Sequence, residues 1–448
     1  MPDTRNARIG DYRSRGYLTH LQLRNFRAFE SEEIKLAPIT IIVGPNNAGK
    51  SSILSALRVL SQTLQSVDPE VPLLLGEFGT YRDVVYKNKA TKSFGIRLGM
   101  QFGDKSQAFE VNFRYRAQRR EIIQQDFVAY EDGQRTLRTV YSRDVGRQSV
   151  DWVAAAAAPA MRQIKVRFFH FLPRVMHLQY EFPRFPRTPT SKPQFLATLR
   201  EIDNFLLEVS RTLSRLQYLG PFRDAPLRAY PFSGERPSTL TVGGKGATDI
   251  LVADFFRRGT QKKALSIMVQ AWLAKAQIAR AVDVRALSDR QYDIRLQHPT
   301  TGELENLADV GYGISQVLPV LVAGYNMQPG SVFVVEQPEL HLHPRAQFEL
   351  GDFLYQLHRR RVQSIVETHS EHLILRLQGL VGEGLIAPED IAVNFVCAEE
   401  DRKRVVLLPL NEDGIFTRKW PHGFFEERLE EALRLARAPL KRKAKQRG

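Results

Sequence analysis

The feature that most constrains the fold is residues 44–51, which read GPNNAGKS. This loop follows a short, apolar, β-branched run at residues 39–43, and apolar residues recur at helical spacing through residues 51–60. The sequence therefore predicts a buried strand, a tight loop and a helix. In such an arrangement the glycines let successive backbone amides point at one anion, and the helix N-terminus directs its positive end at the same charge. The motif in this context is typical of the phosphate-binding loop of nucleotide triphosphatases.

Individual side chains of this loop have predictable roles in nucleotide binding. Lys50 would neutralise the β and γ phosphates of ATP, and the Ser51 hydroxyl would complete the shell of a Mg²⁺ ion. ATP and Mg²⁺ are therefore the expected cofactors. The other residues predicted to bind the nucleotide are Gly44, Asn46, Asn47, Ala48, Gly49 and Ser52.

Two later apolar runs end in polar residues that suit the same site. Residues 332–335 lead into Glu336-Gln337-Pro338-Glu339. An acid at the tip of a buried strand can ligate a Mg²⁺ ion that bridges to the nucleotide, so Glu336 is the predicted metal ligand. A third run ends in Glu367-Thr368-His369-Ser370, one helix length further on. That spacing favours a role for His369 at the site over that of an ordinary polar loop residue.

A second candidate anion site lies just before Glu336. Residues 309–316 read DVGYGISQ, and the apolar helical run 317–323 follows. Glycines and a serine that open a helix can bind an anion. Taken alone, the same pattern is more often an ordinary capped helix start.

The order of these motifs resembles that of the ATP-binding-cassette ATPases, closest to the branch that includes the RecF, SMC and overcoming-lysogenization-defect ATPases. Residues 21–29 (LQLRNFRAF) and 339–344 (ELHLHP) resemble segments that this branch has before the loop and after the acid. Residues 218–223 (YLGPFR) and 420–425 (WPHGFF) are similar to a bacterial subgroup whose C-terminal module has no assigned function.

The resemblance implies an α/β fold, an ATPase head with an antiparallel β subdomain, a mostly parallel core sheet and an inserted helical lobe. It also implies that two heads face each other, as a homodimer or a higher homo-oligomer. Carried over to this chain, Gly313 and Ser315 would contact the γ phosphate held by the Lys50 of a second copy. His369 would be the switch histidine that senses this phosphate.

One departure from the family pattern concerns catalysis. The family usually has a second acid where this chain has Gln337, directly after Glu336. A glutamine can orient water through hydrogen bonds but cannot take its proton at neutral pH. Either hydrolysis is slow and ATP acts chiefly as a dimerising ligand, or Glu339 supplies the negative charge. The predicted catalytic set is therefore Glu336, Gln337, Glu339 and His369.

Periodicity along the chain suggests four parts. Residues 1–150 would hold the loop and antiparallel hairpins, because residues 75–142 alternate between apolar and polar. Residues 151–290 would form an inserted arm and a helical lobe, with helical patterns at 195–213 and 249–286. Residues 291–400 would complete the head as alternating strands and helices. Residues 401–448 would form a small C-terminal module and a basic tail.

Composition bounds the class of protein. The 448 residues are 43% hydrophobic, enough for a substantial core, and no apolar run approaches the roughly 18–20 residues that span a bilayer. Residues 1–16 are polar and arginine-rich, without an apolar signal segment. A single Cys397 excludes an intrachain disulfide and suits the cytosol. We therefore expect a cytoplasmic protein without membrane contact.

The net charge of +15 and the sequence pI near 9.8 suggest a polyanionic partner. Basic clusters occur at residues 114–120, expected on a strand, at 358–361 and at 441–447. Each cluster also has a simpler explanation, as a solvated strand face, a helix C-terminus or a solubilising tail. Two functions therefore stay open. One is an ATPase that acts with DNA in repair or antiviral defence, and the other is an ATP-dependent scaffold that holds and releases a separately encoded effector, such as a nuclease or toxin.

Overall fold

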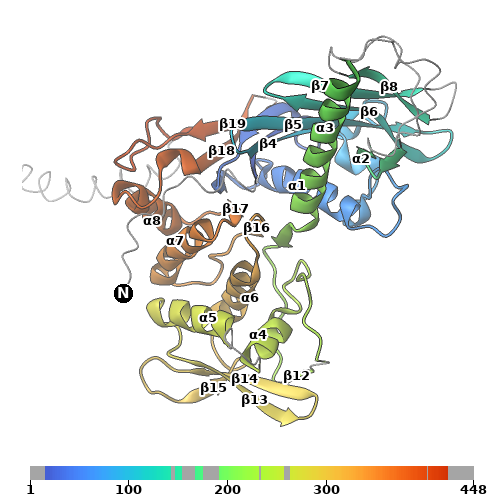
Figure 1. Ribbon diagram of the computed structural model, residues 1–448. Coiled ribbons are helices and arrows are strands. Elements are labelled where there is room, and N and C mark those ends of the chain that lie inside the picture. The colour runs from blue at the N-terminus through green and yellow to red at the C-terminus, as the bar shows by residue number, and fades with distance from the viewer. Residues whose placement is uncertain are drawn as a thin grey trace, which may run out of the picture.

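The computed structural model describes residues 16–142, 147–153, 167–174, 191–231, 234–256, 263–400 and 402–421. These residues form two large sheets and two small ones, with helices packed between and beside them (Figure 1). The predicted linker at residues 182–193 falls largely outside the described part, and the basic tail lies wholly outside it. Most of the WPHGFF segment is also outside.

The core sheet is mostly parallel and carries the predicted strands. Its order is β11-β16-β17-β3-β18-β19, and only the last pair is antiparallel. Every residue of β3, β16 and β17 is buried, as expected for strands covered on both faces. The strands are β3 (Ile39–Val43), β11 (Gln217–Leu219), β16 (Val332–Glu336), β17 (Gln363–Glu367), β18 (Ile391–Glu399) and β19 (Arg402–Leu408).

The second large sheet is entirely antiparallel, in the order β2-β1-β4-β5-β6-β7-β8. It confirms the hairpins predicted from the alternation of residues 75–142 from Phe94 onward, whereas residues 76–88 form short helices instead. Its strands are β1 (Tyr17–Phe26), β2 (Phe29–Lys35), β4 (Phe94–Phe102), β5 (Lys105–Arg116), β6 (Glu121–Glu131), β7 (Gln134–Ser142) and β8 (Arg147–Val153). The short helix α2 (Tyr81–Val84) precedes β4, and β9 (Arg167–Phe169) pairs with β10 (Leu172–Arg174).

Two separate cores lie on the two faces of the core sheet. Val332 and Val334 of β16 pack into the core that contains helix α1 (Lys50–Leu64), helix α3 (Ser191–Ser214) and the large antiparallel sheet. Phe333 and Val335 pack into the other core. Residues from five helices share this second core: α4 (Ala247–Phe255), α5 (Ala264–Lys275), α6 (Tyr312–Asn326), α7 (Pro344–Arg359) and α8 (Glu371–Gly382). The alternation follows from the two-residue period of a strand.

The helical pattern expected at residues 249–286 is wrong at its end. Helix α5 ends at Lys275, and Val282 begins a strand of a small antiparallel sheet. Its strands are β12 (Tyr230–Pro231), β13 (Val282–Ser288), β14 (Gln291–Gln297) and β15 (Leu304–Asn306). The alanine-rich pattern favours a helix, but pairing with β14 buries Val282 and Val284 and overrides it. Residues 291–297, expected as part of the head, therefore lie in this small sheet and not in the core sheet.

The helices that precede α6 in the chain belong to different cores. Helix α3 packs against α1, whereas α4 and α5 pack against α6. Figure 1 shows the large antiparallel sheet and the small sheet of β12 to β15 at opposite ends of the molecule. The core sheet therefore separates the face that carries the phosphate-binding loop from the face that carries α6.

Candidate nucleotide-binding site

Three parallel neighbouring strands bring the predicted residues to one edge of the core sheet. Glu336 at the end of β16 is in register with Glu367 at the end of β17, and Glu367 is in register with Ile42 of β3. The phosphate-binding loop follows β3 directly. Side chains at the carboxyl ends of parallel strands face the same crevice. Lys50, Ser51, Glu336 and Glu367 therefore converge although they are far apart in sequence.

Two positions of the loop require glycine. Gly44 has a φ of +145°, and a Cβ there would lie 2.1 Å from the carbonyl oxygen of Val396. Gly49 has a φ of +111°, and a Cβ there would lie 2.9 Å from the Cβ of Ala28. A side chain at either position would be strained and would clash. These two residues fix the curl of the chain at the start of α1.

The tip of the loop faces solvent. Pro45, Asn46 and Asn47 are exposed, whereas Ala48 is buried. The Asn47 carbonyl accepts a hydrogen bond of 2.9 Å from the Lys403 ammonium of β19. The amide of Ser52 donates to the carbonyl of Gly49 at 3.0 Å, which begins the helical pattern. The predicted loop residues thus lie together, with the exposed tip accessible to a nucleotide.

Lys50 is buried, with 5% of its surface exposed. Its ammonium donates to the carbonyl oxygens of Gly44 at 3.0 Å and Pro45 at 2.9 Å. It also lies 3.7 Å from Oε1 of Glu367. Burial lowers the pKa of Lys50, and the Glu367 carboxylate opposes that shift. The ammonium is held at the mouth of the loop, where phosphate oxygens could replace the two carbonyls.

Glu367 is a site residue that the sequence reasoning did not single out. The Ser51 hydroxyl donates to its Oε2 at 3.3 Å. Burial, and after it the nearby Glu336, raises the pKa of Glu367 to about 7, although Lys50 and the Ser51 hydrogen bond oppose the shift. Its position at a strand tip, directly before Thr368 and His369, was the available signal.

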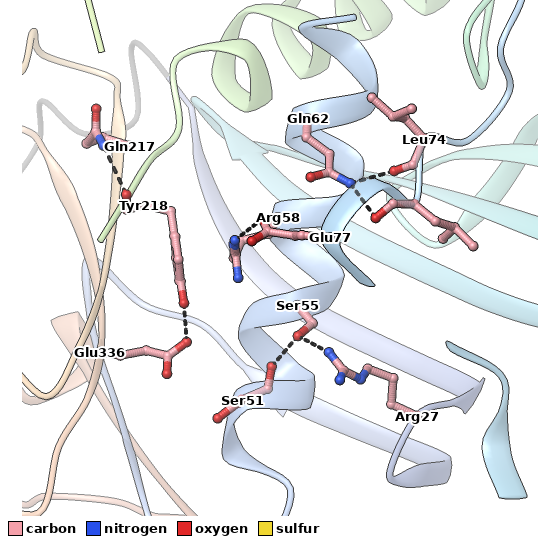
Figure 2. Close-up of polar contacts among 11 residues, drawn as sticks. Arg27, Ser51, Ser55, Arg58, Gln62, Leu74, Glu77, Gln217, Tyr218 and Glu336 are labelled. Atoms are coloured by element: carbon pink, nitrogen blue, oxygen red, sulfur yellow. Dashed lines mark hydrogen bonds and ion pairs between the residues drawn. The ribbon is translucent and has the colours of Figure 1, made fainter. Parts of the chain in front are cut away.

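Glu336 is buried, and its carboxylate accepts a hydrogen bond from the phenol of Tyr218 on β11. Figure 2 shows the Tyr218 side chain directed at Glu336, on the side of α1 where Ser51 lies. Burial, followed by the Glu336 charge, raises the pKa of Tyr218, so the phenol stays protonated and acts as a donor. The YLGPFR segment, noted only for its resemblance, thus contributes a residue to the site.

A buried arginine fixes the chain directly after Glu336. Arg223 donates to the carbonyl oxygens of Glu336 at 2.7 Å and Gln337 at 3.2 Å. Burial lowers the pKa of Arg223 to about 10, and the charges of Glu339 and Glu336 oppose the shift, so the guanidinium stays charged at neutral pH. Gln337 itself has a φ of +44°, and its backbone amide donates to the backbone carbonyl of Glu367 at 2.7 Å. Arg223 therefore supports an uncommon backbone conformation at the candidate water-facing position.

Glu339 and His369 are joined through the backbone. The amide of His369 donates to Oε1 of Glu339 at 2.7 Å. Burial raises the pKa of Glu339, while this hydrogen bond favours its charged form. Burial and then Lys50 lower the pKa of His369, so its imidazole is neutral at pH 7. The structure thus brings the predicted switch histidine to the same edge as the acids.

The start of α6 packs against the segment that follows Glu339. Gly313 is packed so closely that a Cβ would lie 2.4 Å from the carbonyl oxygen of His341. Ser315 is 5% exposed, and its hydroxyl donates to the carbonyl of Tyr312 at 2.7 Å. The apolar face of α6 belongs to one core and that of α1 to the other. Gly313 and Ser315 therefore flank the opposite face of the sheet from the loop of their own chain.

The ligand set fits a hard cation. Ser51 offers a hydroxyl oxygen, and Glu336 and Glu367 offer carboxylates, the oxygen ligands that Mg²⁺ prefers. Across the described ranges, no group of three or more His, Cys, Asp or Glu side chains could hold a metal by itself. The residues present suit an ion that shares its shell with nucleotide phosphates.

The first basic cluster lies largely at the surface: Arg114, Arg119 and Arg120 are exposed, and Arg116 pairs with Glu121 at 3.2 Å. The expectation of one strand through residues 114–120 is wrong, because β5 ends at Arg116 and Arg120 lies in the following turn with a φ of +52°. Arg360 donates to the carbonyls of Tyr325 and Met327 at the C-terminal end of α6, at 2.8 and 3.5 Å. This contact agrees with the helix-terminus explanation.

The fold and the site define a P-loop ATPase. Two family models match the chain: one described as an AAA ATPase domain, over residues 17–198, and one described as an AAA domain, putative AbiEii toxin, Type IV TA system, over residues 179–376. The chain is accordingly a P-loop ATPase of this AAA kind, related to RecF and to the OLD nuclease. This confirms the relationship predicted from the motifs.

The similar curated proteins match only short segments. The DNA replication and repair protein RecF of Paenarthrobacter aurescens (strain TC1) is 40% identical over 72 residues, 15% of this chain and 17% of RecF. The OLD nuclease of Thermus scotoductus (strain ATCC 700910 / SA-01) is 52% identical over 40 residues, 9% of this chain and 8% of the nuclease. The chain thus spans less than a fifth of the length of these relatives.

Solved SMC heads resemble the chain over most of its length but distantly. The SmcHead bound to the C-winged helix domain of ScpA covers 88% of this chain and 98% of its own, with a TM-score of 0.46 and 12% identity. The SMC head domain from Thermotoga maritima covers 88% and 99%, with a TM-score of 0.42 and 12% identity. Within the described part of the chain, no helix combines the length and apolarity needed to cross a membrane.

Proposed function

We propose that this chain binds ATP with Mg²⁺ at the edge formed by β3, β16 and β17, and that it hydrolyses ATP slowly. The observation that supports this most directly is the convergence of Lys50, Ser51, Glu336 and Glu367 at one edge of the sheet. Lys50 would hold the β and γ phosphates, and Ser51 and Glu336 would ligate Mg²⁺. The bound ion would neutralise charge that develops on the phosphates.

We further propose that the active form contains two copies of the chain. Helices α1 and α6 cover opposite faces of the core sheet, so Gly313 and Ser315 suit a nucleotide held by a second copy better than their own. The chain would then act as a homodimer or a higher homo-oligomer that closes around ATP. His369, directed by the Glu339 contact to its amide, would respond to the γ phosphate.

Gln337 and Glu339 are the two candidates for activating the attacking water. Gln337 cannot accept a proton at neutral pH, and one oxygen of Glu339 is already engaged by the His369 amide. Glu339 still carries the raised pKa that a general base needs. If Gln337 alone faces the water, turnover is slow and bound ATP acts mainly to hold two copies together. If Glu339 supplies the negative charge instead, the chain turns ATP over with Glu339 as the base.

The direct test is equilibrium binding of ATP with and without Mg²⁺, followed by steady-state hydrolysis. Binding tightened by Mg²⁺ and lost in Lys50→Ala would support the proposal. Lys403→Ala is the matched control, because Lys403 contacts the loop only through the Asn47 carbonyl and should bind ATP nearly as the wild type does. Equal binding by the wild type and Lys50→Ala would refute a phosphate site at this loop.

The biological role divides into two proposals. The net charge of +15 and the similarity to proteins described as DNA replication and repair proteins favour an ATPase that acts with DNA, in repair or antiviral defence. The toxin named in the description of one matching family model favours an ATP-dependent scaffold for a separate effector. Gln337 in place of an acid also favours the scaffold, because a site without a base suits prolonged binding of ATP better than rapid hydrolysis.

Salt-dependent DNA binding separates these roles. If phosphates of DNA are neutralised by this chain, affinity should fall steeply with salt, and deletion of residues 441–448 should weaken duplex binding equally across sequences and reduce the salt slope. Absence of DNA binding at low salt would indicate that the excess positive charge serves binding to a protein partner instead.

A further inference from the structure

The hydrogen bond between Tyr218 and Glu336 is backed by a stacked arginine. The guanidinium of Arg58 lies 3.7 Å from the centroid of the Tyr218 ring, close enough for a strong cation–π contact. The phenol at the other end of the ring donates to the Glu336 carboxylate. Figure 2 shows Arg58 of α1 beside the face of the Tyr218 ring and Glu336 at the hydroxyl end of that ring.

Arg58 and Tyr218 are themselves held by further contacts. Arg58 forms an ion pair with Glu77 and lies 5.0 Å from the centroid of the Phe78 ring. Tyr218 is held by strand pairing with Val334 of β16 and by the Gln217 side-chain amide, which donates to its carbonyl at 3.0 Å. The phenol therefore has little freedom to turn away from Glu336.

The position of this donor matters because two acids lie side by side. Glu336 and Glu367 are register partners on adjacent strands, and Lys50 pairs with Glu367. The partner of Glu336 is a neutral phenol, which occupies a lone pair without cancelling the negative charge. A carboxylate held in this way keeps a charged oxygen for a cation.

We propose that Tyr218 is a positioning residue for the metal site: its hydroxyl orients the Glu336 carboxylate toward the Mg²⁺ of bound ATP, and Arg58 locks its ring. This inference rests on the proposed MgATP site and assigns a role to the YLGPFR segment. It also links α1, which carries Lys50 and Ser51, to the acid on β16 through one aromatic side chain.

The test compares how much Mg²⁺ tightens nucleotide binding. The dissociation constant of a fluorescent, non-hydrolysable ATP analogue is measured in EDTA and in excess Mg²⁺, and the ratio of the two is the magnesium enhancement. Tyr218→Phe keeps the ring and its stacking but removes the hydroxyl. We expect its enhancement to fall about 3- to 10-fold, the scale of one lost hydrogen bond, with the constant in EDTA unchanged.

Two further variants sharpen the comparison. Arg58→Gln should lower the enhancement in the same direction by a smaller factor, because the ring loses its stacking partner. Gln62→Ala is the matched control on the same helix: its amide donates to the carbonyls of Leu74 and Leu75 and does not contact Tyr218. It should leave the enhancement at the wild-type value.

The outcomes distinguish this inference from the proposed site. A wild-type protein without any magnesium enhancement would refute the MgATP site itself. A clear wild-type enhancement that is equal in Tyr218→Phe would overturn only the role of Tyr218. If Tyr218→Phe weakens binding equally in EDTA and in Mg²⁺, the hydroxyl is merely structural and the proposal is again wrong.

Discussion

The phosphate-binding loop and the start of α6 are built in opposite ways. At the loop, Lys50 and Glu367 are almost fully buried and paired with each other. At the start of α6, Gly311 and Tyr312 are exposed, with 53% of the Tyr312 surface accessible, and the Ser315 hydroxyl is satisfied by its own helix. The loop region is a preorganised cluster of buried charges, whereas the start of α6 exposes Gly311 and Tyr312 and keeps Ser315 buried.

This difference suggests a division of labour. The loop side carries two cations, Lys50 and Arg223, among three acids, Glu336, Glu339 and Glu367. Such a site favours a ligand that brings additional positive charge, as MgATP does relative to ATP. The exposed residues at the start of α6, Gly311 and Tyr312, carry no charge of their own. We therefore infer that the loop decides affinity and that α6 decides assembly.

The largest effect should come from the loop. Lys50→Ala removes the cation that faces the phosphates and leaves Glu367 without its ion-pair partner. We expect ATP affinity to fall by at least about 10²-fold, since contacts to charged groups are the strong ones. Isothermal titration calorimetry measures this directly. A loss of less than threefold would break the proposed division.

Catalytic substitutions should have the next largest effect. If Gln337 faces the attacking water, Gln337→Glu should raise kcat by up to about 10²-fold, the scale of general-base catalysis. If Glu339 serves instead, Glu339→Gln should abolish turnover and preserve ATP binding. Glu336→Gln should weaken both affinity and rate, because a metal ligand is lost. Near-wild-type steady-state rates in all three variants would place the catalytic strand elsewhere.

A moderate and selective effect is expected at α6. Ser315→Arg inserts a long side chain where the second copy should approach, so ATP-dependent self-association should weaken by roughly tenfold, about the effect of a disrupted contact at an interface centre. ATP affinity of the single chain should stay within twofold of the wild type. Sedimentation velocity and calorimetry on the same sample check both parts. Parallel loss of affinity and association would show that α6 contributes to the site of its own chain.

The smallest effect concerns stability and pH. Because Glu367 has a pKa of about 7 in the folded chain against an ordinary 4.5, the folded state binds this proton more tightly than the unfolded state. Its contribution to stability therefore falls as pH rises from about 4.5 to about 7. Glu367→Gln should make the nucleotide-free protein about 1–3 kcal/mol more stable above pH 7, and the gain should vanish below pH 4.5. Urea unfolding at several pH values tests this, and a gain that persists at low pH would contradict it.

The sequence was most informative where chemistry is local. The loop sits between a β-branched run and a helical pattern, and its two required glycines lie within a few residues of Lys50. The acid and histidine at later strand tips were predictable because parallel strands end at a common edge. The relationship to RecF and OLD-type ATPases followed from the order of these motifs.

The rest depends on contacts that no local pattern reveals. Tyr218 lies 118 residues from Glu336, and Arg223 lies 113 residues from the same position, so only the packing of β11 against β16 brings them together. The prediction of a helix up to residue 286 was wrong for the same reason, because pairing with β14 overrides the alanine-rich pattern. Glu367 is part of the Glu367-Thr368-His369-Ser370 segment noted in the sequence, but only the folded structure shows that it pairs with Lys50.

The central claim, that each nucleotide lies between the loop of one copy and the α6 start of another, is tested most directly by mixing two defective variants. Lys50→Ala keeps an intact α6, and Ser315→Arg keeps an intact loop. We expect Lys50→Ala alone not to self-associate with ATP and Ser315→Arg alone to self-associate only weakly. The equimolar mixture should form more ATP-dependent dimer than either variant, with partial hydrolysis, in sedimentation and turnover measurements. A mixture whose mass and rate equal the average of the separate variants would contradict the claim.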